Sequence, residues 1–514
     1  MESYLARVTD IATPYLDRLA HTTPRQRIVT ISAALSAVLV LRALNHLIRP
    51  PPALRSLPRV GARNIVSLLT RGIEKTAYGL TLPAAQKHEL GMYVCLDITG
   101  WSVHIAKPQV AKQFLRNNDI TKGTLFQDLM RDTIVGLFLG GPNIGIVNDD
   151  AWKKQRMIAN PAFHRSMPLD LFAELSFKAF NLIEQAENRT LEFDSLMSRF
   201  TLDVIGRAGF GFDFNALGDK NNDWVRKYHC VNEALTDMSL GTIPFVDRNF
   251  YWLIPSRARA RRDLTDLLTM MRGMIDAKRE QLGKQSNIKE REKDLLTLML
   301  EAGNEAGAAM SDDELLANLC FFFVAGHDTT ASALTYAIYW LARNPDIQAK
   351  AREEVRHVLG TTASDKAPTA EQIKAMPYIN RIIHESLRIN PPATFTLPRF
   401  AARDTELGGI LIPKGTCVRV DIFEMQRNPD LWKDPEAFNP DREETEGWLP
   451  FSGGPRQCLG MNFSLQEQRV FLPLLLQRYQ WSLPDDSIHR GTLQLKGSFL
   501  LKPDRVGVVF KPLD

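Results

Sequence analysis

Most of the chain carries the hydrophobic pattern of helices, and alternating, strand-like stretches are short. The clearest helix runs from Ser311 to Asn344, because Ser311 and Glu314 fit a capping box and Pro345 marks the end. Its middle, LCFFFVAGHDTTASAL, is apolar and nearly uncharged, so we expect it to cross the interior. Strand-like pieces lie at 92–98, 102–106, 410–421 and 493–510.

These patterns predict a mostly α fold with small peripheral β-sheets. From residue 61 onward we find no internal repeat and no long linker, which predicts one large domain over 61–514. The preceding segment 49–60, RPPPALRSLPRV, is rich in proline and cannot continue a helix. We expect it to act as a stiff spacer.

An apolar run precedes this spacer. Residues 28–41, IVTISAALSAVLVL, are apolar or small, and the run extends to residue 48 if Arg42 reaches the lipid headgroups. Because a membrane helix needs roughly 20 residues, we predict a single-pass anchor at 28–48. A cleaved signal peptide and a buried helix are the alternatives. Within the N-terminal segment 1–27, residues 3–19 have an amphipathic pattern interrupted by Pro14.

Composition excludes several classes of function. The net charge of the 514 residues is only +4 and is spread along the chain, so we expect no nucleic-acid partner. The five cysteines are widely spaced and form no CxxC pair, which argues against a disulfide framework and a cysteine-based zinc site. A reducing compartment fits this cysteine usage.

One of these cysteines, Cys458, stands in the glycine-rich stretch PFSGGPRQCLG at 450–460, directly before another apolar helical run. Glycines allow a flat ligand to approach the backbone, and the positive end of the following helix favours thiolate over thiol. A lone thiolate suits a metal that needs one protein ligand from this loop, such as haem iron. The alternative is a small residue in a packed loop.

The pattern Phe451-x-x-Gly454-x-Arg456-x-Cys458-x-Gly460 resembles the haem-binding loop of the cytochrome P450 superfamily at every defining position. The resemblance implies the fold of that family and haem b, iron protoporphyrin IX, with Cys458 as the axial thiolate ligand of the metal. It also implies that Phe451 shields the sulfur and that Arg456 pairs with a haem propionate.

Three further stretches match the family, in the family's own order along the chain. Glu385 and Arg388 in HESLR, with Arg442 in FNPDR, resemble its structural triad, in which two arginines and a carboxylate form a buried network. Taken alone, Glu385 and Arg388 could be a solvated helix pair. Arg388 also excludes the zinc motif HExxH, which requires histidine there. Glu443 departs from the family, which often has an aromatic residue after the second arginine.

The stretch AGHDTT at 325–330 resembles the oxygen-binding segment of the family. The resemblance implies that Ala325 and Gly326 leave a groove for dioxygen beside the haem. It makes Thr329 the hydrogen-bond partner of the activated oxygen and Asp328 a relay of protons from water. The alternative is a helix distorted by a threonine that bonds to its own backbone. His327 has no assigned chemistry, although a buried histidine could tune the relay.

Family positions supply further candidates. Trp152, Arg156 and Arg399 match residues that contact the propionates. Lys153 and Lys154 then fall where an acidic reductase docks, or on an ordinary solvated helix face. Apolar candidates for substrate contacts, which are equally consistent with core packing, are Phe126, Leu137, Phe138, Phe322, Leu397 and Phe499. The aromatic and basic stretch 249–262 could dip into an anionic membrane or be a loop before a solvated helix.

Together these features predict a membrane-bound haem-thiolate monooxygenase, similar to microsomal P450 members, that hydroxylates a lipophilic fatty acid, steroid, other lipid or xenobiotic with O₂. No flavin or nicotinamide motif follows, so electrons come from an NADPH-dependent flavoprotein reductase. We expect a monomer in the endoplasmic reticulum membrane with its catalytic domain in the cytoplasm. The alternatives are a haem-thiolate isomerase or dehydratase acting on a peroxide, and a non-enzymatic haem carrier or sensor.

Overall fold

The computed structural model describes residues 23–164, 167–237, 243–284, 293–302, 310–363, 365–443, 445–497 and 499–513. The chain divides into one unit from Met1 to Ser56 and another from Leu57 to Asp514, so the division lies inside the proline-rich segment 49–60. The amphipathic pattern expected at 3–19 lies outside the described residues.

Helix α2 (Pro24–Ile48), in the first unit, contains the whole segment 28–48 in which we expected a membrane anchor. Across the described parts of the chain, however, no helix combines the length and the apolar character needed to cross a bilayer. The polar residues Thr30, Ser32 and Arg42 interrupt the apolar run and lower its mean hydropathy. The prediction of a transmembrane helix is therefore not supported.

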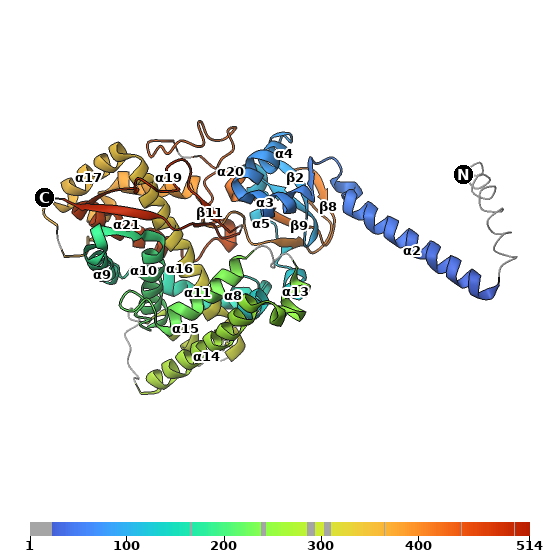
Figure 1. Ribbon diagram of the computed structural model, residues 1–514, viewed down its shortest axis with the longest axis horizontal. Helices are drawn as coiled ribbons and strands as arrows, with labels where there is room; N and C mark the ends of the chain where they lie inside the picture. The colour runs from blue at the N-terminus through green and yellow to red at the C-terminus, as the bar shows by residue number, and fades with distance from the viewer. Residues whose placement is uncertain are drawn as a thin grey trace. The chain divides into compact units, whose positions relative to one another are not determined.

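The second unit is mostly helical, as predicted (Figure 1). Its helices are α3 (Arg63–Thr76), α4 (Leu82–Gln86), α5 (Pro108–Arg116), α6 (Leu125–Met130), α7 (Ile134–Leu139), α8 (Asp149–His164), α9 (Leu169–Gln185), α10 (Phe193–Ile205), α11 (Asp223–Thr236), α13 (Pro244–Asn249), α14 (Pro255–Lys284), α15 (Leu295–Glu301), α16 (Asp312–Arg343), α17 (Pro345–Leu359), α18 (Ala370–Lys374), α19 (Pro377–Ile389), α20 (Ile422–Met425) and α21 (Met461–Arg478). Figure 1 shows α9, α10, α17 and α21 at one end of this unit and α3, α4 and α5 at the other.

The strands form small sheets, and the largest has the order β1-β2-β3-β9-β6-β4. The strands are β1 (Arg59–Gly61), β2 (Met92–Asp97), β3 (Gly100–Ile105), β4 (Ile120–Thr121), β5 (Thr190–Glu192), β6 (Arg399–Ala401), β7 (Thr405–Leu407), β8 (Ile410–Ile412), β9 (Cys417–Val420), β10 (Tyr479–Ser482), β11 (Leu495–Lys496), β12 (Lys502–Pro503) and β13 (Gly507–Pro512). The hairpin β2-β3 confirms the strands expected at 92–98 and 102–106. The piece expected at 410–421 instead contains two strands, β8 and β9, that belong to different sheets.

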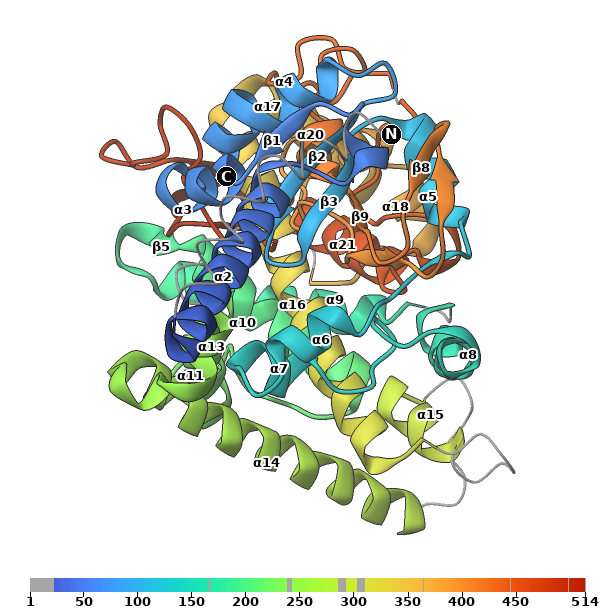
Figure 2. The ribbon, with the colours of Figure 1, turned by 90° about the vertical axis from the view of Figure 1, so that its right-hand side faces the viewer.

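Helix α16 runs through the interior of the second unit (Figure 2). The predicted capping box is present: the Ser311 hydroxyl accepts a hydrogen bond from the Glu314 N–H, and the Glu314 carboxylate accepts one from the Ser311 N–H. At 1.5 Å per residue, its 32 residues extend over about 48 Å. Nearly all its side chains from Leu315 to Leu341 are buried, which confirms the expected interior helix.

Helix α10 approaches α16 closely at Gly326. A Cβ atom on Gly326 would lie only 2.9 Å from the Cγ1 atom of Ile205, closer than such atoms approach. One residue further on, the carbonyl oxygen of His327 accepts a hydrogen bond of 3.1 Å from the Thr201 hydroxyl of α10. The packing of α10 therefore requires a small residue at Gly326, and the groove for dioxygen expected at Ala325 and Gly326 stays a prediction.

We predict that Gly326→Ala destabilises the protein by roughly 1–3 kcal/mol, because the added methyl group overpacks the contact with Ile205. Ile205→Val in the same chain should recover part of this loss, as measured by the denaturant midpoint of unfolding. Gly273→Ala is the matched control, since a Cβ on Gly273 in α14 meets nothing within 4 Å. A loss of stability in the control as large as in Gly326→Ala would contradict this account.

Candidate functional site

The glycine-rich loop before α21 holds Cys458 in an ordered turn. The N–H of Cys458 donates to the carbonyl oxygen of Phe451 over 3.0 Å, and α21 follows after Gly460. Gly454 has a φ of +68°, and a Cβ there would lie 2.9 Å from the carbonyl oxygen of Leu115, so both conformation and space require glycine. Cys458 is exposed on one side, and its thiol is available to a ligand.

The electrostatics of Cys458 are mixed. Burial against the loop raises the pKa of the thiol, while hydrogen bonds from the backbone of Gly460 and Met461 and the charge of Arg156 oppose that rise. The start of α21 therefore favours thiolate, as expected, but it does not outweigh desolvation.

Three cations, Lys122, Arg399 and Arg456, lie together beside this loop. The Lys122 ammonium donates to the Leu397 carbonyl oxygen over 2.9 Å, and both arginines have only long contacts of 3.3–3.4 Å to oxygen atoms. Burial lowers the pKa of Arg399 to about 10, and burial with repulsion from Arg399 lowers that of Arg456 to about 10. Burial and the two arginines lower the pKa of Lys122 as well.

No carboxylate among the described residues forms an ion pair with any of these three cations; Asp149 acts on Arg456 only from a greater distance. Repulsion among neighbouring cations is unfavourable without an anion. A ligand with two carboxylates, such as the propionates of haem, fits this cluster. Lys122 escaped the sequence analysis because it lies in no motif; the antiparallel pairing of Thr121 with Phe400 brings it opposite Arg399.

Helix α8 supports the cysteine loop through the two residues expected at the propionates. The Arg456 guanidinium lies 4.3 Å from the centre of the Trp152 ring. Arg156 donates from Nη1 to the carbonyl oxygen of Gln457 over 3.0 Å. In this structure Trp152 therefore positions Arg456, and Arg156 positions the cysteine loop. Lys153 pairs with Asp150, which is typical of a solvated helix face.

In the middle of α16, Ala325 is the one exposed residue between Leu315 and Leu341. An exposed alanine in an otherwise buried stretch of helix faces space that protein atoms leave open. The Thr329 hydroxyl lies one turn away and donates to the Ala325 carbonyl oxygen over 2.8 Å. This is the bond from a threonine to its own helix backbone that we gave as the alternative to a role in oxygen binding.

Asp328 lies in a buried polar cage. Its carboxylate is 2.8 Å from the Lys502 ammonium of β12 and accepts a hydrogen bond of 2.5 Å from the Tyr228 hydroxyl of α11. Asn232 donates to it over 3.3 Å, and His327 Nε2 lies at the same distance. Burial by itself would raise the pKa of Asp328. Lys502 and His327 act in the opposite direction and prevail, so the pKa of Asp328 lies below its usual value.

The cage shows how the expected relay of protons from water could reach Asp328. The carboxylate is only 3% exposed and is linked to solvent through Lys502, which is 24% exposed. His327 Nδ1 lies 2.6 Å from the Phe323 carbonyl oxygen, and burial lowers the pKa of this histidine. The sequence offered no signal for Lys502, because the C-terminal hairpin brings it to α16 from 174 residues away along the chain.

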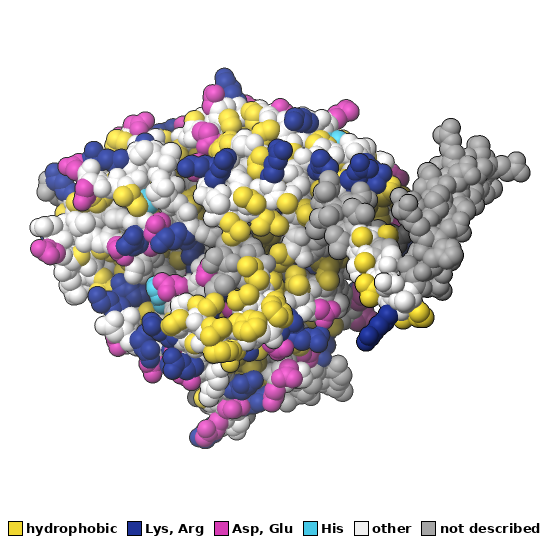
Figure 3. All heavy atoms as spheres, turned by 45° about the vertical axis from the view of Figure 1, so that its right-hand side comes forward, with side chains coloured by type: hydrophobic (Ala, Val, Ile, Leu, Met, Phe, Trp, Pro, Cys, Tyr) yellow, Lys and Arg dark blue, Asp and Glu magenta, His cyan; other side chains and the backbone are white. Residues whose placement is uncertain are grey.

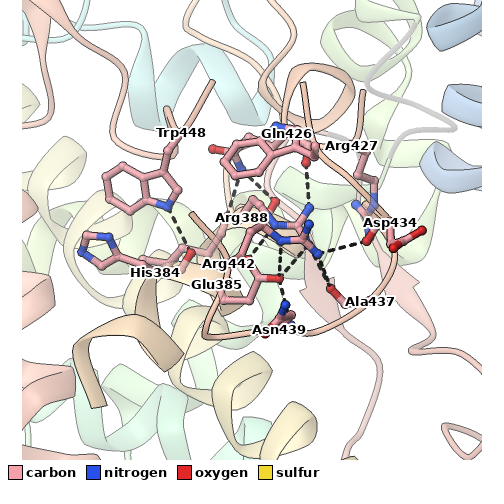
Figure 4. Close-up of polar contacts among 12 residues, drawn as sticks. His384, Glu385, Arg388, Gln426, Arg427, Asp434, Ala437, Asn439, Arg442 and Trp448 are labelled. Atoms are coloured by element: carbon pink, nitrogen blue, oxygen red, sulfur yellow. Dashed lines mark hydrogen bonds and ion pairs between the residues drawn. The ribbon is translucent and has the colours of Figure 1, made fainter. Parts of the chain in front are cut away.

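The triad expected from Glu385, Arg388 and Arg442 is brought together in the structure (Figure 4). Arg388 binds the Glu385 carboxylate through Nε and Nη2, at 2.7 and 2.9 Å, and Arg442 Nε donates to it over 3.2 Å. The Asn439 N–H adds a contact of 3.0 Å. Glu385 and Arg388 are 5% and 1% exposed, so the alternative of a solvated helix pair is wrong.

Gln426 is a third residue, after Lys122 and Lys502, that the sequence motifs did not identify. Its backbone carbonyl oxygen accepts a hydrogen bond of 2.9 Å from Arg388 Nη1 (Figure 4). Glu443, the departure from the family pattern, is exposed and lines a shallow hollow beside the triad.

The apolar candidates for substrate contacts separate into two groups. Phe138 and Phe322 are 1% and 7% exposed and belong to the hydrophobic core, where Phe322 packs against Phe163. This packing favours the alternative of core residues for both, and their contact with substrate stays a prediction. Leu137, Leu397 and Phe499 are at least partly exposed. The side chain of Phe126 lies outside the described residues.

Comparisons with known proteins agree with this geometry. The family model "Cytochrome P450" matches residues 92–510. The protein LUTEIN DEFICIENT 5, chloroplastic, of Arabidopsis thaliana is 29% identical, over 74% of this chain and 65% of its own length. Cytochrome P450 97B2, chloroplastic, of Glycine max is 30% identical over 74% of both chains, and cytochrome P450 4F3 of Rattus norvegicus is 30% identical over 69% of this chain and 71% of its own.

A solved structure shows the same fold. The crystal structure of the cytochrome P450DA heme domain superposes with a TM-score of 0.71 at 23% identity, covering 88% of this chain and 95% of that one. Members of the matching family use haem with an axial cysteine thiolate, and the exposed thiol and unpaired cations described above fit that cofactor. The chain therefore belongs to the cytochrome P450 family of haem-thiolate monooxygenases.

Proposed function

We propose that this protein is a membrane-associated monooxygenase that hydroxylates a lipophilic substrate, with Cys458 as the axial ligand of its haem. The observation that carries the proposal is an exposed thiol beside a cluster of cations, Lys122, Arg399 and Arg456, for which the described part of the chain supplies no carboxylate partner. A planar dianionic cofactor with a metal centre meets both needs at once.

When bound, haem supplies the activation of O₂, and the residues of this chain hold and protect it. Cys458 would bind the iron, and Lys122, Arg399 and Arg456 would bind the propionates. Trp152 and Arg156 hold Arg456 and the Gln457 carbonyl in place. The exposed Ala325 leaves room on the side of α16 that the cofactor would face.

The Asp328 cage supports proton delivery. A proton taken up from solvent at Lys502 Nζ can pass to the Asp328 carboxylate, which is 2.8 Å away. Thr329 is the next residue, and its hydroxyl donates only to the carbonyl oxygen of Ala325, beside the exposed methyl group. A turn of the Asp328 side chain would carry the proton toward that hydroxyl. A proton relay has a purpose in an oxygenase and none in a haem carrier.

Two surfaces support the proposed kinds of substrate and electron donor. The partly exposed Leu137, Leu397 and Phe499 favour an apolar substrate. A surface hollow along α8, lined by Trp152, Lys153, Arg156, Met157, Asn160 and Pro161, offers cations beside the cysteine loop to an NADPH-dependent flavoprotein reductase. The substrate, the position attacked and the endoplasmic reticulum as compartment stay predictions.

Membrane association is supported by exposed apolar side chains. Hydrophobic side chains gather on the face shown in Figure 3. Within 243–253, the exposed apolar residues are Ile243, Phe245, Phe250, Trp252 and Leu253, of which Phe245 and Trp252 are 64% and 62% exposed. The basic stretch contributes less than expected, because Arg257 is 2% exposed and bonded to the Ala234 carbonyl oxygen.

The primary test is the carbon monoxide difference spectrum of the reduced protein. Wild type should show the red-shifted band typical of thiolate ligation, and Cys458→His should lose it while retaining haem. Cys320→Ser is the control, because this buried thiol lies on a different element, α16, and not in the cysteine loop. A folded wild-type protein without haem, or a thiolate-type band in Cys458→His, would disprove the proposal.

The relay predicts a shift in pH dependence. Lys502→Met removes the main charge that lowers the Asp328 pKa, so burial should raise that pKa and move the acidic limb of the pH–turnover profile to higher pH. Lys502→Arg should restore the profile, and Asp328→Asn should lower turnover by about 10²-fold or more. An unchanged profile in Lys502→Met would remove Lys502 from the relay. Asp313→Asn, at the exposed start of α16, is the control.

The membrane hypothesis predicts that residues 57–514 sediment with phosphatidylcholine–phosphatidylserine vesicles. Replacing Phe245, Trp252 and Leu253 together by serine should weaken partitioning by roughly tenfold or more, because each apolar side chain contributes on the order of 1–2 kcal/mol when inserted. The control replaces Leu411 and Ile488, which are 51% and 60% exposed elsewhere. Equal sedimentation of both variants would contradict this membrane-facing surface.

A further inference from the structure

Gln426, directly after α20, lies beside the Glu385 network (Figure 4) and is hydrogen-bonded to Leu449, which precedes the loop that carries Cys458. Its side chain is fully buried. A buried carboxamide is costly unless each of its polar atoms has a partner, so its hydrogen bonds show what it holds.

The amide group of Gln426 bridges two separate segments. Nε2 donates to the carbonyl oxygens of Leu387 and Arg388, at 3.0 and 2.9 Å, in the last turn of α19. These carbonyls have no partner within the helix, because a helix leaves its last four unpaired. At the other end of the amide, Oε1 accepts the N–H of Leu449 over 2.8 Å.

Leu449 leads directly into the cysteine loop. Its own carbonyl oxygen accepts the N–H of Ser452 over 3.0 Å, and Phe451 accepts the N–H of Cys458 at the same distance. The neighbouring Trp448 supplies a second link to α19, since its indole N–H donates to the His384 carbonyl oxygen over 3.0 Å. The entry to the loop is therefore tied to α19 at two adjacent positions.

We propose that Gln426 is a positioning residue: it links the C-terminal end of α19 to the start of the cysteine loop and thereby fixes the position of the Cys458 sulfur. Arg388 takes part twice, because its side chain donates to the backbone carbonyl of Gln426 while its own carbonyl accepts from the Gln426 amide. The effect on iron ligation rests on the proposed role of Cys458, whereas the effect on the loop does not.

The chemistry of the site restricts the residue type. The side chain must place a donor against the carbonyl oxygens of Leu387 and Arg388 and an acceptor against the N–H of Leu449. A carboxamide meets both needs, because it has an NH₂ group and an oxygen atom. Glutamate at this position keeps an acceptor for Leu449 but places a second oxygen against the two carbonyls. Methionine keeps the length and loses every hydrogen bond. A neutral histidine carries one donor and one acceptor and is the expected rescue.

The chain offers a matched control in Gln348 of α17. This glutamine is 3% exposed, donates to the Leu341 and Trp481 carbonyl oxygens at 3.0 Å each, and accepts the Trp481 N–H over 3.2 Å. It thus repeats the bonding pattern of Gln426, with one additional hydrogen bond of 2.8 Å that Oε1 accepts from Arg352 Nη2, while joining elements that do not enter the cysteine loop. Gln348→Met removes equivalent hydrogen bonds elsewhere.

The test compares hydrogen exchange and the carbon monoxide difference spectrum in the purified haem protein. In Gln426→Met and Gln426→Glu, amides in peptides covering 448–460 should exchange about tenfold faster, and part of the thiolate-type band should be lost. Gln348→Met should leave both readouts unchanged at the loop, and Gln426→His should restore most of them. If Gln426→Met does not fold, the contrast between Gln426→Glu and Gln426→His decides.

Unchanged exchange at 448–460 in the Gln426 variants would overturn the inference, and so would equal acceleration there in Gln348→Met. The two proposals fail separately. A wild-type protein that lacks the thiolate-type band refutes the proposed function, while the exchange comparison still decides whether Gln426 positions the loop.

Discussion

The burial of the Glu385 carboxylate against two guanidinium groups is the interaction on which the cysteine loop depends. Removing charges from water is costly, and the cost is offset only when the geometry is good and the remaining polar atoms are bonded. Arg388 meets this condition with a bidentate contact to Glu385 and a contact to the Gln426 carbonyl. Because a half-satisfied network would be unstable, α19 and the segments bonded to it are held in one arrangement.

The opposite situation holds at the three cations beside the loop. Lys122, Arg399 and Arg456 repel one another, and all three have a lowered pKa. A cofactor that supplies the missing carboxylates binds only the folded chain, so its binding free energy adds to the stability of the fold. The two clusters therefore differ: the charges of the Glu385 network are satisfied within the protein, and those of Lys122, Arg399 and Arg456 would be satisfied by the cofactor proposed above.

Local patterns in the sequence predicted much of this architecture. The capping box of α16, the hairpin β2-β3 and the glycine-rich loop depend on residues close together in the chain. Contacts between distant segments were beyond such patterns. Lys122 meets Arg399 only through the pairing of β4 with β6, and Lys502 meets Asp328 only through the C-terminal hairpin. Gly326 shows the same limit, since its neighbour Ile205 belongs to α10.

Helix α16 combines these constraints, because neighbouring positions on it face different surroundings. Ala325 faces open space, Gly326 faces α10, and Asp328 faces Lys502 and Tyr228. Close packing at Gly326 fixes the position of the helix, so the directions of the adjacent side chains are fixed as well. Asp328 is held by the charge of Lys502 and by hydrogen bonds, so the turn of its side chain in the proposed relay must break these contacts. The backbone of α16 is therefore fixed on both sides of Asp328, and in the proposed relay only this side chain would have to move.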